Sequence, residues 1–226
     1  MKKFVVISHT HWDREWYMPF SVFRMKLVDL IDRLLGILER DSDYIFHLDA
    51  QTIVLEDYLA IHPLNEEKLK QYIASGNIRV GPWYLQNDFY LTDGEATVRN
   101  LMIGTAIAKQ FGKCGTVGYA PDQFGNISQL PQIIRQFGLR AFVFGRGFRF
   151  HETVDGVRRE KKMPAEFEWE GPDGTRCLAI HLRYWYNNAQ HIPEQRELAR
   201  LLLAINARNF EGLNVSRYIL LMHGVD

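Results

Sequence analysis

The chain has 226 residues, of which 46% are hydrophobic, so its length and composition allow one sizeable core, and a single domain is expected. Its 27 basic and 27 acidic residues balance, which argues against nucleic acid or an anionic membrane as a partner. No apolar run reaches the length of a membrane span, and two widely separated cysteines favour a reducing compartment, so we expect a soluble, cytoplasmic protein.

Helix-type and strand-type patterns alternate along the chain. Apolar periodicity and helix-ending residues predict helices over residues 21–40, 51–61, 66–74, 93–111, 128–137 and 193–206. In the first of these, the predicted buried stripe is Val22, Met25, Val28, Ile31, Leu35 and Leu38. Short apolar runs predict strands over residues 4–7, 44–48, 78–80, 117–120, 141–144 and 218–222. This alternation is typical of parallel βαβ units and predicts the α/β class.

Two further segments depart from the alternating pattern. Residues 165–169 and 176–182 flank the turn sequence Pro172-Asp173-Gly174 and predict a hairpin. Residues 148–162 are charged and have little periodicity, so they are interpreted as a loop. The chain stops directly after the predicted strand at residues 218–222, and we therefore expect it to be the N-terminal part of a longer protein.

Polar residues that suit a metal follow the first predicted strand. His9, His11 and Asp13 alternate, so an extended chain directs their side chains to one face. Ligands bind at the carboxyl ends of strands in parallel α/β folds, and imidazole and carboxylate groups are common ligands of zinc. The alternative is that these residues are hydrogen-bonded polar groups at a strand end.

Other predicted strands also end in polar residues, namely Asp122, Arg146, His223 and Asp226. Each has an ordinary structural interpretation: Asp122 as a helix cap, Arg146 as a surface turn residue and Asp226 as a chain-end carboxylate. In a closed parallel sheet, however, these ends converge on one mouth. Two carboxylates, a metal-ligating histidine and an arginine beneath aromatic side chains match the needs of glycoside hydrolysis.

Three short motifs carry a resemblance to a known family. His-Thr-His-Trp-Asp-Arg-Glu-Trp at residues 9–16, Pro-Asp-Gln-Phe-Gly at 121–125 and Gly-Val-Asp at 224–226 resemble the N-terminal catalytic domain of glycoside hydrolase family 38, the retaining α-mannosidases, and its bacterial members in particular. The resemblance covers the whole chain. It implies one catalytic α/β domain over residues 1–226, built as an irregular, roughly seven-stranded parallel (β/α) barrel with the hairpin as a small insertion.

The resemblance also implies roles for individual residues. His11, Asp13 and Asp122 match ligands of one Zn²⁺ ion, Asp122 being the nucleophile as well, and Asp226 matches the general acid/base. His9 is then a residue that orients a ligand. The family's fourth zinc ligand is a histidine downstream of this chain, and His223 is a poor substitute because it does not share a strand face with Asp226.

Further residues match the substrate contacts of the family. These are Trp16 as the platform under the mannose ring, Phe124 as an apolar wall, Arg146 beside the nucleophile, and Tyr186 as a substrate contact that Tyr184 matches about as well. The expected partners are an α-mannoside and the remaining C-terminal domains of the same polypeptide. The sequence leaves open the aglycone, the 6-phosphorylation of the mannose, and the oligomeric state, a homo-oligomer included.

The sequence thus predicts a zinc-dependent retaining α-mannosidase that acts through a covalent mannosyl-aspartate intermediate. Two alternatives remain at this stage. One is a metal-dependent carbohydrate deacetylase on a related barrel, in which the metal activates water. The other is a non-catalytic sugar-binding module, because the fourth zinc ligand is missing here and this segment alone is then expected to bind zinc weakly and to be inactive.

Overall fold

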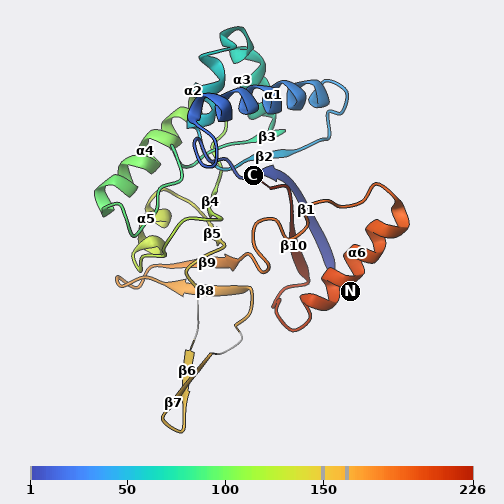
Figure 1. Cartoon of the computed structure of the whole chain (residues 1–226). Coiled ribbons are helices and arrows are strands. Elements are labelled where there is room, and N and C mark those ends of the chain that lie inside the picture. Colours follow the sequence, from blue (N-terminus) through green and yellow to red (C-terminus); the bar gives the residue numbers. More distant parts are fainter. Residues whose placement is uncertain (1, 149–150, 161–162, 226) are drawn as a thin grey trace. The chain divides into compact units, whose positions relative to one another are not determined.

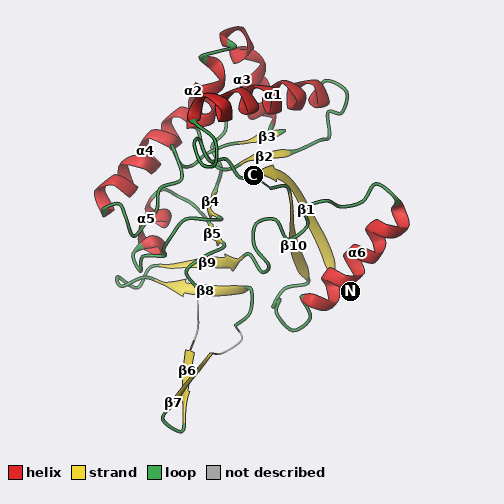
Figure 2. Ribbon diagram, viewed as in Figure 1, coloured by secondary structure: helices red, strands yellow, loops and turns green. Residues whose placement is uncertain are grey.

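The computed structural model describes residues 2–148, 151–160 and 163–225. Figures 1 and 2 show its helices and strands. The chain divides into two compact units. We call Ser8–Asn87 with Gly94–Thr116 the N-terminal unit, and Met1–Ile7, Asp88–Asp93 and Val117–Val225 the C-terminal unit. Strand β1 (Lys3–Thr10) contributes its first residues to the C-terminal unit and its last residues to the N-terminal unit.

Parallel strands form the sheet of the N-terminal unit. The end of β1 pairs with β2 (Phe46–Leu48), His9 lying opposite His47, and β2 pairs with β3 (Ile78–Arg79). The helices of this unit are α1 (Phe20–Leu38), α2 (Ile53–Leu59), α3 (Glu66–Ser75) and α4 (Gly94–Gln110), with a 3₁₀ turn η1 at Pro63–Asn65. The predicted helices and parallel strands of this part of the chain are therefore confirmed, with ends that differ by a few residues.

Helix α1 presents a different face to the core than the sequence suggests. Val22 and Met25, which belong to the predicted stripe, are 40% and 55% exposed. The buried residues of α1 are Phe23, Leu27, Val28, Ile31, Leu34, Leu35 and Leu38. The two stripes share most of their members, so only the first turns of the helix distinguish them, and there the ring of Phe23 is buried against Trp12. That part of the prediction was wrong.

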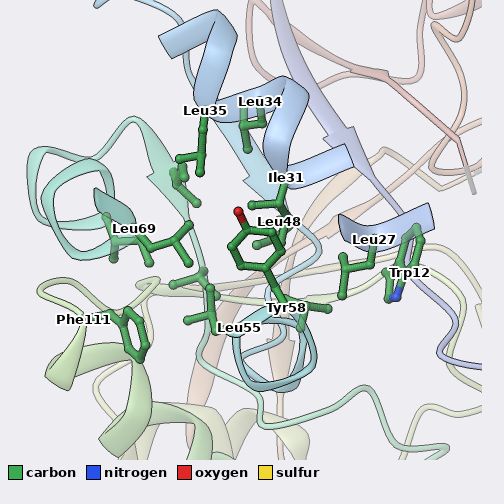
Figure 3. Close-up of a cluster of buried hydrophobic side chains, with 14 of the residues drawn as sticks. Trp12, Leu27, Ile31, Leu34, Leu35, Leu48, Leu55, Tyr58, Leu69 and Phe111 are labelled. Atoms are coloured by element: carbon green, nitrogen blue, oxygen red, sulfur yellow. The ribbon is translucent and has the colours of Figure 1, made fainter. Parts of the chain in front are cut away.

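Tyr58 of α2 lies in the middle of this core (Figure 3), among side chains that include Leu27, Leu48 and Leu69. Its hydroxyl donates a hydrogen bond to Asp32 over 2.6 Å and accepts one from the side chain of Asn65. Burial, together with the Asp32 carboxylate, raises the pKa of Tyr58 to about 12. The polar end of this buried ring is therefore satisfied, as a buried hydroxyl must be.

The C-terminal unit contains a mixed sheet in the order β4-β5-β9-β8. Its strands β4 (Val117–Ala120), β5 (Ala141–Phe144) and β9 (Arg176–His181) are parallel, and β8 (Glu166–Glu170) is antiparallel to β9. The predicted hairpin is thus confirmed, and its second strand continues the parallel sheet. Helix α5 (Leu130–Gln136) packs near β9, and the core of α6 (Arg196–Asn209) and β10 (Tyr218–His223) is built from Phe210, Ile219 and Leu221.

The interpretation of residues 148–162 as a loop was wrong for 151–160, and residues 149–150 and 161–162 lie outside the described residues. β6 (His151–Val154) and β7 (Val157–Glu160) form an antiparallel hairpin, drawn in Figure 1 as a ribbon that projects away from β8 and β9. Asp155 and Gly156 at its turn have φ angles of 53° and 76°. Two positive φ angles in a two-residue turn suit Asp-Gly, and this sequence signal was available.

The α/β class with parallel strand pairing is confirmed, while the sheets are mixed. Closure into a barrel of roughly seven strands, and a single domain over residues 1–226, stay predictions. In the part of the chain that the structure describes, no helix is both long and apolar enough to cross a membrane.

Gly104 allows α4 to approach the backbone of residues 82–84. A methyl group at Gly104 would lie 2.1 Å from the carbonyl carbon of Trp83, whereas one at Gly94, at the start of the same helix, would meet nothing within 4 Å. We predict that Gly104→Ala lowers the free energy of unfolding by about 3 kcal/mol or more, because backbone cannot yield to the added atom. Gly94→Ala, measured alongside by urea denaturation, leaves it unchanged or slightly higher. Equal effects of the two variants would refute this close contact.

Candidate functional site

His11 follows β1 and is oriented by a buried carboxylate. Its Nδ1 lies 3.0 Å from Oδ2 of Asp49, and its Nε2 lies 3.7 Å from Oδ1 of Asp13. A ring nitrogen beside a buried carboxylate carries the proton, so we assign the tautomer with Nδ1 as donor and the Nε2 lone pair toward Asp13. An imidazole nitrogen and a carboxylate oxygen that lie near each other are a pair of ligand atoms that suits a divalent metal.

Asp49 holds more than His11. Its side chain has no solvent exposure, and its Oδ2 also accepts hydrogen bonds of 2.8 Å from the backbone N–H of Trp12 and from Nε2 of Gln51. The same Gln51 nitrogen donates to the carbonyl of Trp12 over 2.8 Å. Asp49 and Ala50 have φ angles of 46° and 55°, which an L residue adopts at a cost. Asp49 therefore fixes both the ring of His11 and the backbone that follows it.

Sequence reasoning missed Asp49 and Gln51, which directly follow the strand predicted over residues 44–48. The signal that was available is topological. Because β1 and β2 are parallel and pair at Thr10 and Leu48, the residues that directly follow the two strands lie beside each other.

Arg14 anchors the motif segment that carries Trp16. Its Nε and Nη2 donate to Oδ2 and Oδ1 of Asp57 over 2.7 and 2.9 Å, and its guanidinium lies 4.8 Å from the centre of the Phe20 ring. The bidentate geometry fixes the orientation of the pair. Trp16 itself is 73% exposed, so its ring is accessible to a ligand, and its role as a sugar platform stays a prediction.

His9 is buried and lies opposite His47 in the pairing of β1 with β2. Burial lowers the pKa of His47 to about 4, and the neighbouring imidazole of His9 acts in the same direction while Asp49 opposes it. His47 is therefore neutral at physiological pH. The predicted role of His9, to orient a ligand, is not tested by these contacts.

In the C-terminal unit, Asp122 and Arg146 form an ion pair at the ends of neighbouring strands. β4 and β5 are parallel with Ala120 opposite Phe144, so the residues two positions further along each strand are neighbours. The Nε–H of Arg146 donates to Oδ1 of Asp122. Their side chains are 31% and 26% exposed, so the pair is partly shielded from water and still reachable.

Aromatic rings lie against the guanidinium of this pair. The Arg146 guanidinium carbon is 4.7 Å from the centre of the Phe124 ring and 4.2 Å from that of Trp185. Phe124 is held in turn by its backbone, because its N–H donates to Oδ1 of Asp88 over 2.7 Å and its carbonyl accepts from the N–H of Tyr90. The predicted residues Asp122, Phe124 and Arg146 are thus brought together.

Tyr186 is only 7% exposed, and its neighbour Trp185 is the residue that meets Arg146. The predicted substrate contact of Tyr186 stays a prediction. Sequence reasoning missed Trp185, for which the aromatic run Tyr184-Trp185-Tyr186 after a strand was the available signal.

The predicted metal ligands belong to both units, His11 and Asp13 to the N-terminal unit and Asp122 to the C-terminal unit. Asp226 lies outside the described residues. Among the residues that are described, no group of three or more His, Cys, Asp or Glu side chains forms a ready-made metal site.

The sequence model of the glycosyl hydrolases family 38 N-terminal domain matches residues 1–226. The chain belongs to this family. It is 42% identical over 98% of its length to the protein named "Putative mannosylglycerate hydrolase" of Halalkalibacterium halodurans and covers 25% of that protein. It is 30% identical over 76% of its length to alpha-mannosidase 2C1 of Homo sapiens and covers 16% of it.

A solved structure agrees with this assignment. The alpha-mannosidase from Enterococcus faecalis V583 superposes on all of this family 38 domain with a TM-score of 0.91 at 36% identity. The domain covers 25% of that chain, so it spans about a quarter of the length of these bacterial relatives.

The low pKa of His47 predicts how the stability of the domain depends on pH. Since the unfolded chain takes up this proton near pH 6.5 and the folded domain only near pH 4, stability is complete above about pH 6.5 and falls as the pH drops toward 4. We predict that His47→Gln flattens the fall in unfolding free energy between pH 7 and 4.5, measured by urea denaturation. The wild-type domain, measured alongside over the same pH range, supplies the reference slope. An unchanged slope in His47→Gln would contradict the assignment.

Proposed function

We propose that the polypeptide that carries this domain is a zinc-dependent retaining α-mannosidase on an irregular barrel of roughly seven strands. The observation that carries the proposal is the Asp122–Arg146 pair, which sets a candidate nucleophile in a fixed and reachable position within a family 38 domain. The names of the relatives support α-mannosides as the substrate class, and that of the Halalkalibacterium protein adds mannosylglycerate as a candidate.

The residues that would hold the metal are His11, Asp13 and Asp122, with a further ligand from outside this chain. What supports zinc is the donor set: His11 has its Nδ1 bound to Asp49, which leaves the Nε2 lone pair beside the carboxylate of Asp13. When bound, Zn²⁺ supplies positive charge that orients mannose hydroxyl groups and favours the ionised form of a ligating carboxylate.

In the reaction that we propose, the carboxylate of Asp122 attacks the anomeric carbon of the mannoside. The bond from that carbon to the aglycone oxygen breaks, and Asp226 donates its proton to the departing oxygen. Water then attacks the resulting mannosyl ester while Asp226 takes up a proton from it, so that mannose is released and both carboxyl groups return to their starting states.

Arg146 has a defined part in these steps. Its Nε–H engages Oδ1 of Asp122, which fixes the plane of the carboxylate that is to attack. The exposed ring of Trp16 and the half-exposed ring of Phe124 are apolar surfaces of the kind that stack on the C–H face of a sugar.

Variants of the two carboxylates test the mechanism. We predict that Asp122→Ala abolishes turnover of every mannoside, because no ester can form. Asp226→Ala retains much of the activity on aryl mannosides with good leaving groups and loses most of it on natural glycosides, whose leaving oxygen must be protonated. The measurement is mannose release by the purified full-length protein from both substrate types, with acetate release from an acetylated sugar as the assay for a deacetylase. Equal losses on both substrate types would contradict the role of Asp226, and acetate release without mannose release would contradict the proposed function.

The carboxylate of Asp49 should affect the affinity for zinc, because it orients His11. We predict that Asp49→Asn weakens zinc binding by the full-length protein about 10- to 100-fold, because an amide no longer fixes His11 as a carboxylate does. The measurement is competition with a chromophoric chelator, and Asp29→Asn, at an exposed acid of α1, is the control. Unchanged zinc affinity in Asp49→Asn would remove Asp49 from the site.

A further inference from the structure

We infer that Trp185 is a positioning residue for the nucleophile, which acts by holding Arg146 against Asp122. The inference rests on the proposed function of Asp122 and extends it to a residue outside the three sequence motifs at residues 9–16, 121–125 and 224–226. It is carried by the arrangement around one guanidinium, in which two aromatic rings and a carboxylate leave Arg146 with little freedom.

We call the arrangement of Phe124, Trp185 and Asp122 around the guanidinium of Arg146 the clamp. Its guanidinium lies 4.7 Å from the ring centre of Phe124 and 4.2 Å from that of Trp185, while its Nε–H engages Asp122. Both distances are within the range of cation–π attraction, which orients the planar guanidinium against the faces of the rings. A free arginine side chain samples many rotamers, so the two rings reduce the conformational entropy that is lost when Arg146 binds the carboxylate.

The backbone at Trp185 shows that this contact is imposed by the surrounding structure. Tyr184 and Trp185 are consecutive residues with φ angles of 60° and 78°, a left-handed conformation that L residues rarely adopt. Such a conformation persists only where neighbouring contacts determine it, and it is frequent at functional sites.

Neighbouring contacts do fix the segment after β9. The side chain of Asn188 donates to the carbonyls of Arg183 and Leu220 and accepts from the N–H of Met222 over 2.7 Å. On the other side, the hydroxyl of Tyr184 donates to the carbonyl of Asn209 over 3.1 Å. The segment is therefore fastened to β10 and to the end of α6, and this fastening directs the indole of Trp185 onto Arg146.

The rings of the clamp come from two different strand ends. Phe124 follows Asp122 in the same motif after β4, whereas Trp185 follows β9, which pairs with β5 on the other side of Arg146. Trp185 thus adds a second ring, from a different strand end, beside the guanidinium that engages Asp122. Through Arg146, the orientation of Asp122 then depends on Trp185 as well.

The test uses the full-length protein and an aryl α-mannoside. Trp185→Leu keeps apolar bulk without an aromatic face, and Trp185→Phe keeps a smaller aromatic face. We expect kcat to fall roughly 10- to 100-fold in Trp185→Leu with KM within about threefold of the wild type, because a misoriented nucleophile slows the chemical step. Trp185→Phe should recover most of kcat. The control is Tyr218→Ala, which removes a cation–π contact with Arg217 at the start of β10 and leaves both constants unchanged.

A double variant decides whether Trp185 acts through Arg146. In an Arg146→Ala background, Trp185→Leu should lower kcat by less than threefold further. Losses that multiply, or a tenfold rise in KM with kcat retained, would mean that Trp185 contacts the substrate itself and would overturn the inference. An unchanged kcat in Trp185→Leu, or no recovery in Trp185→Phe, would overturn it as well.

If the full-length protein has no α-mannosidase activity, the proposed function is refuted. The clamp is then tested by a second measurement that does not depend on activity. The clamp predicts that the shifts in thermal unfolding midpoint caused by Trp185→Leu and Arg146→Ala are not additive, the double variant unfolding close to the more affected single variant. Additive shifts would show that the two side chains do not interact.

Discussion

Parallel pairing of neighbouring strands in register is the constraint on which the candidate site depends. In the N-terminal unit, the pairing of Thr10 with Leu48 sets His11 beside Asp49, so that the imidazole meets a carboxylate as soon as both strands end. In the C-terminal unit, the pairing of Ala120 with Phe144 sets Asp122 beside Arg146 in the same way. Each polar pair therefore follows from the register of a sheet, and a slip of one residue would direct these side chains to opposite faces.

The two units hold a carboxylate at a strand end in different ways. Asp49 is fully buried, and its Oδ2 accepts hydrogen bonds from His11, Trp12 and Gln51, while its Oδ1 has no hydrogen-bond partner among the described residues. Asp122 keeps about a quarter of its side chain exposed and meets one guanidinium that aromatic rings confine. A carboxylate that is oriented and still accessible is what an attacking group requires, whereas a carboxylate with every contact internal can only orient its neighbours.

Much of this could be predicted from the sequence, because periodicity and strand-end residues are local signals. The helices, the parallel strands and the convergence of Asp122 and Arg146 at strand ends are of this kind, whereas Phe124 was predicted from the resemblance to the family. What escaped prediction depends on pairing between distant segments. Asp49 gains its role only once β2 lies beside β1, and Trp185 gains its role only once Asn188 fastens the segment after β9 to β10. The choice of Phe23 over Val22 in α1 likewise depends on where Trp12 lies.

The central claim is that Asp122 attacks the sugar, and covalent trapping tests it most directly. The full-length protein would be incubated with a fluorinated mannosyl fluoride that forms the ester quickly and loses it slowly, then digested and analysed by mass spectrometry. The account predicts one mannosyl adduct on the peptide that contains Asp122. An adduct on another carboxylate, or release of mannose with inverted anomeric configuration in a parallel NMR measurement, would contradict it.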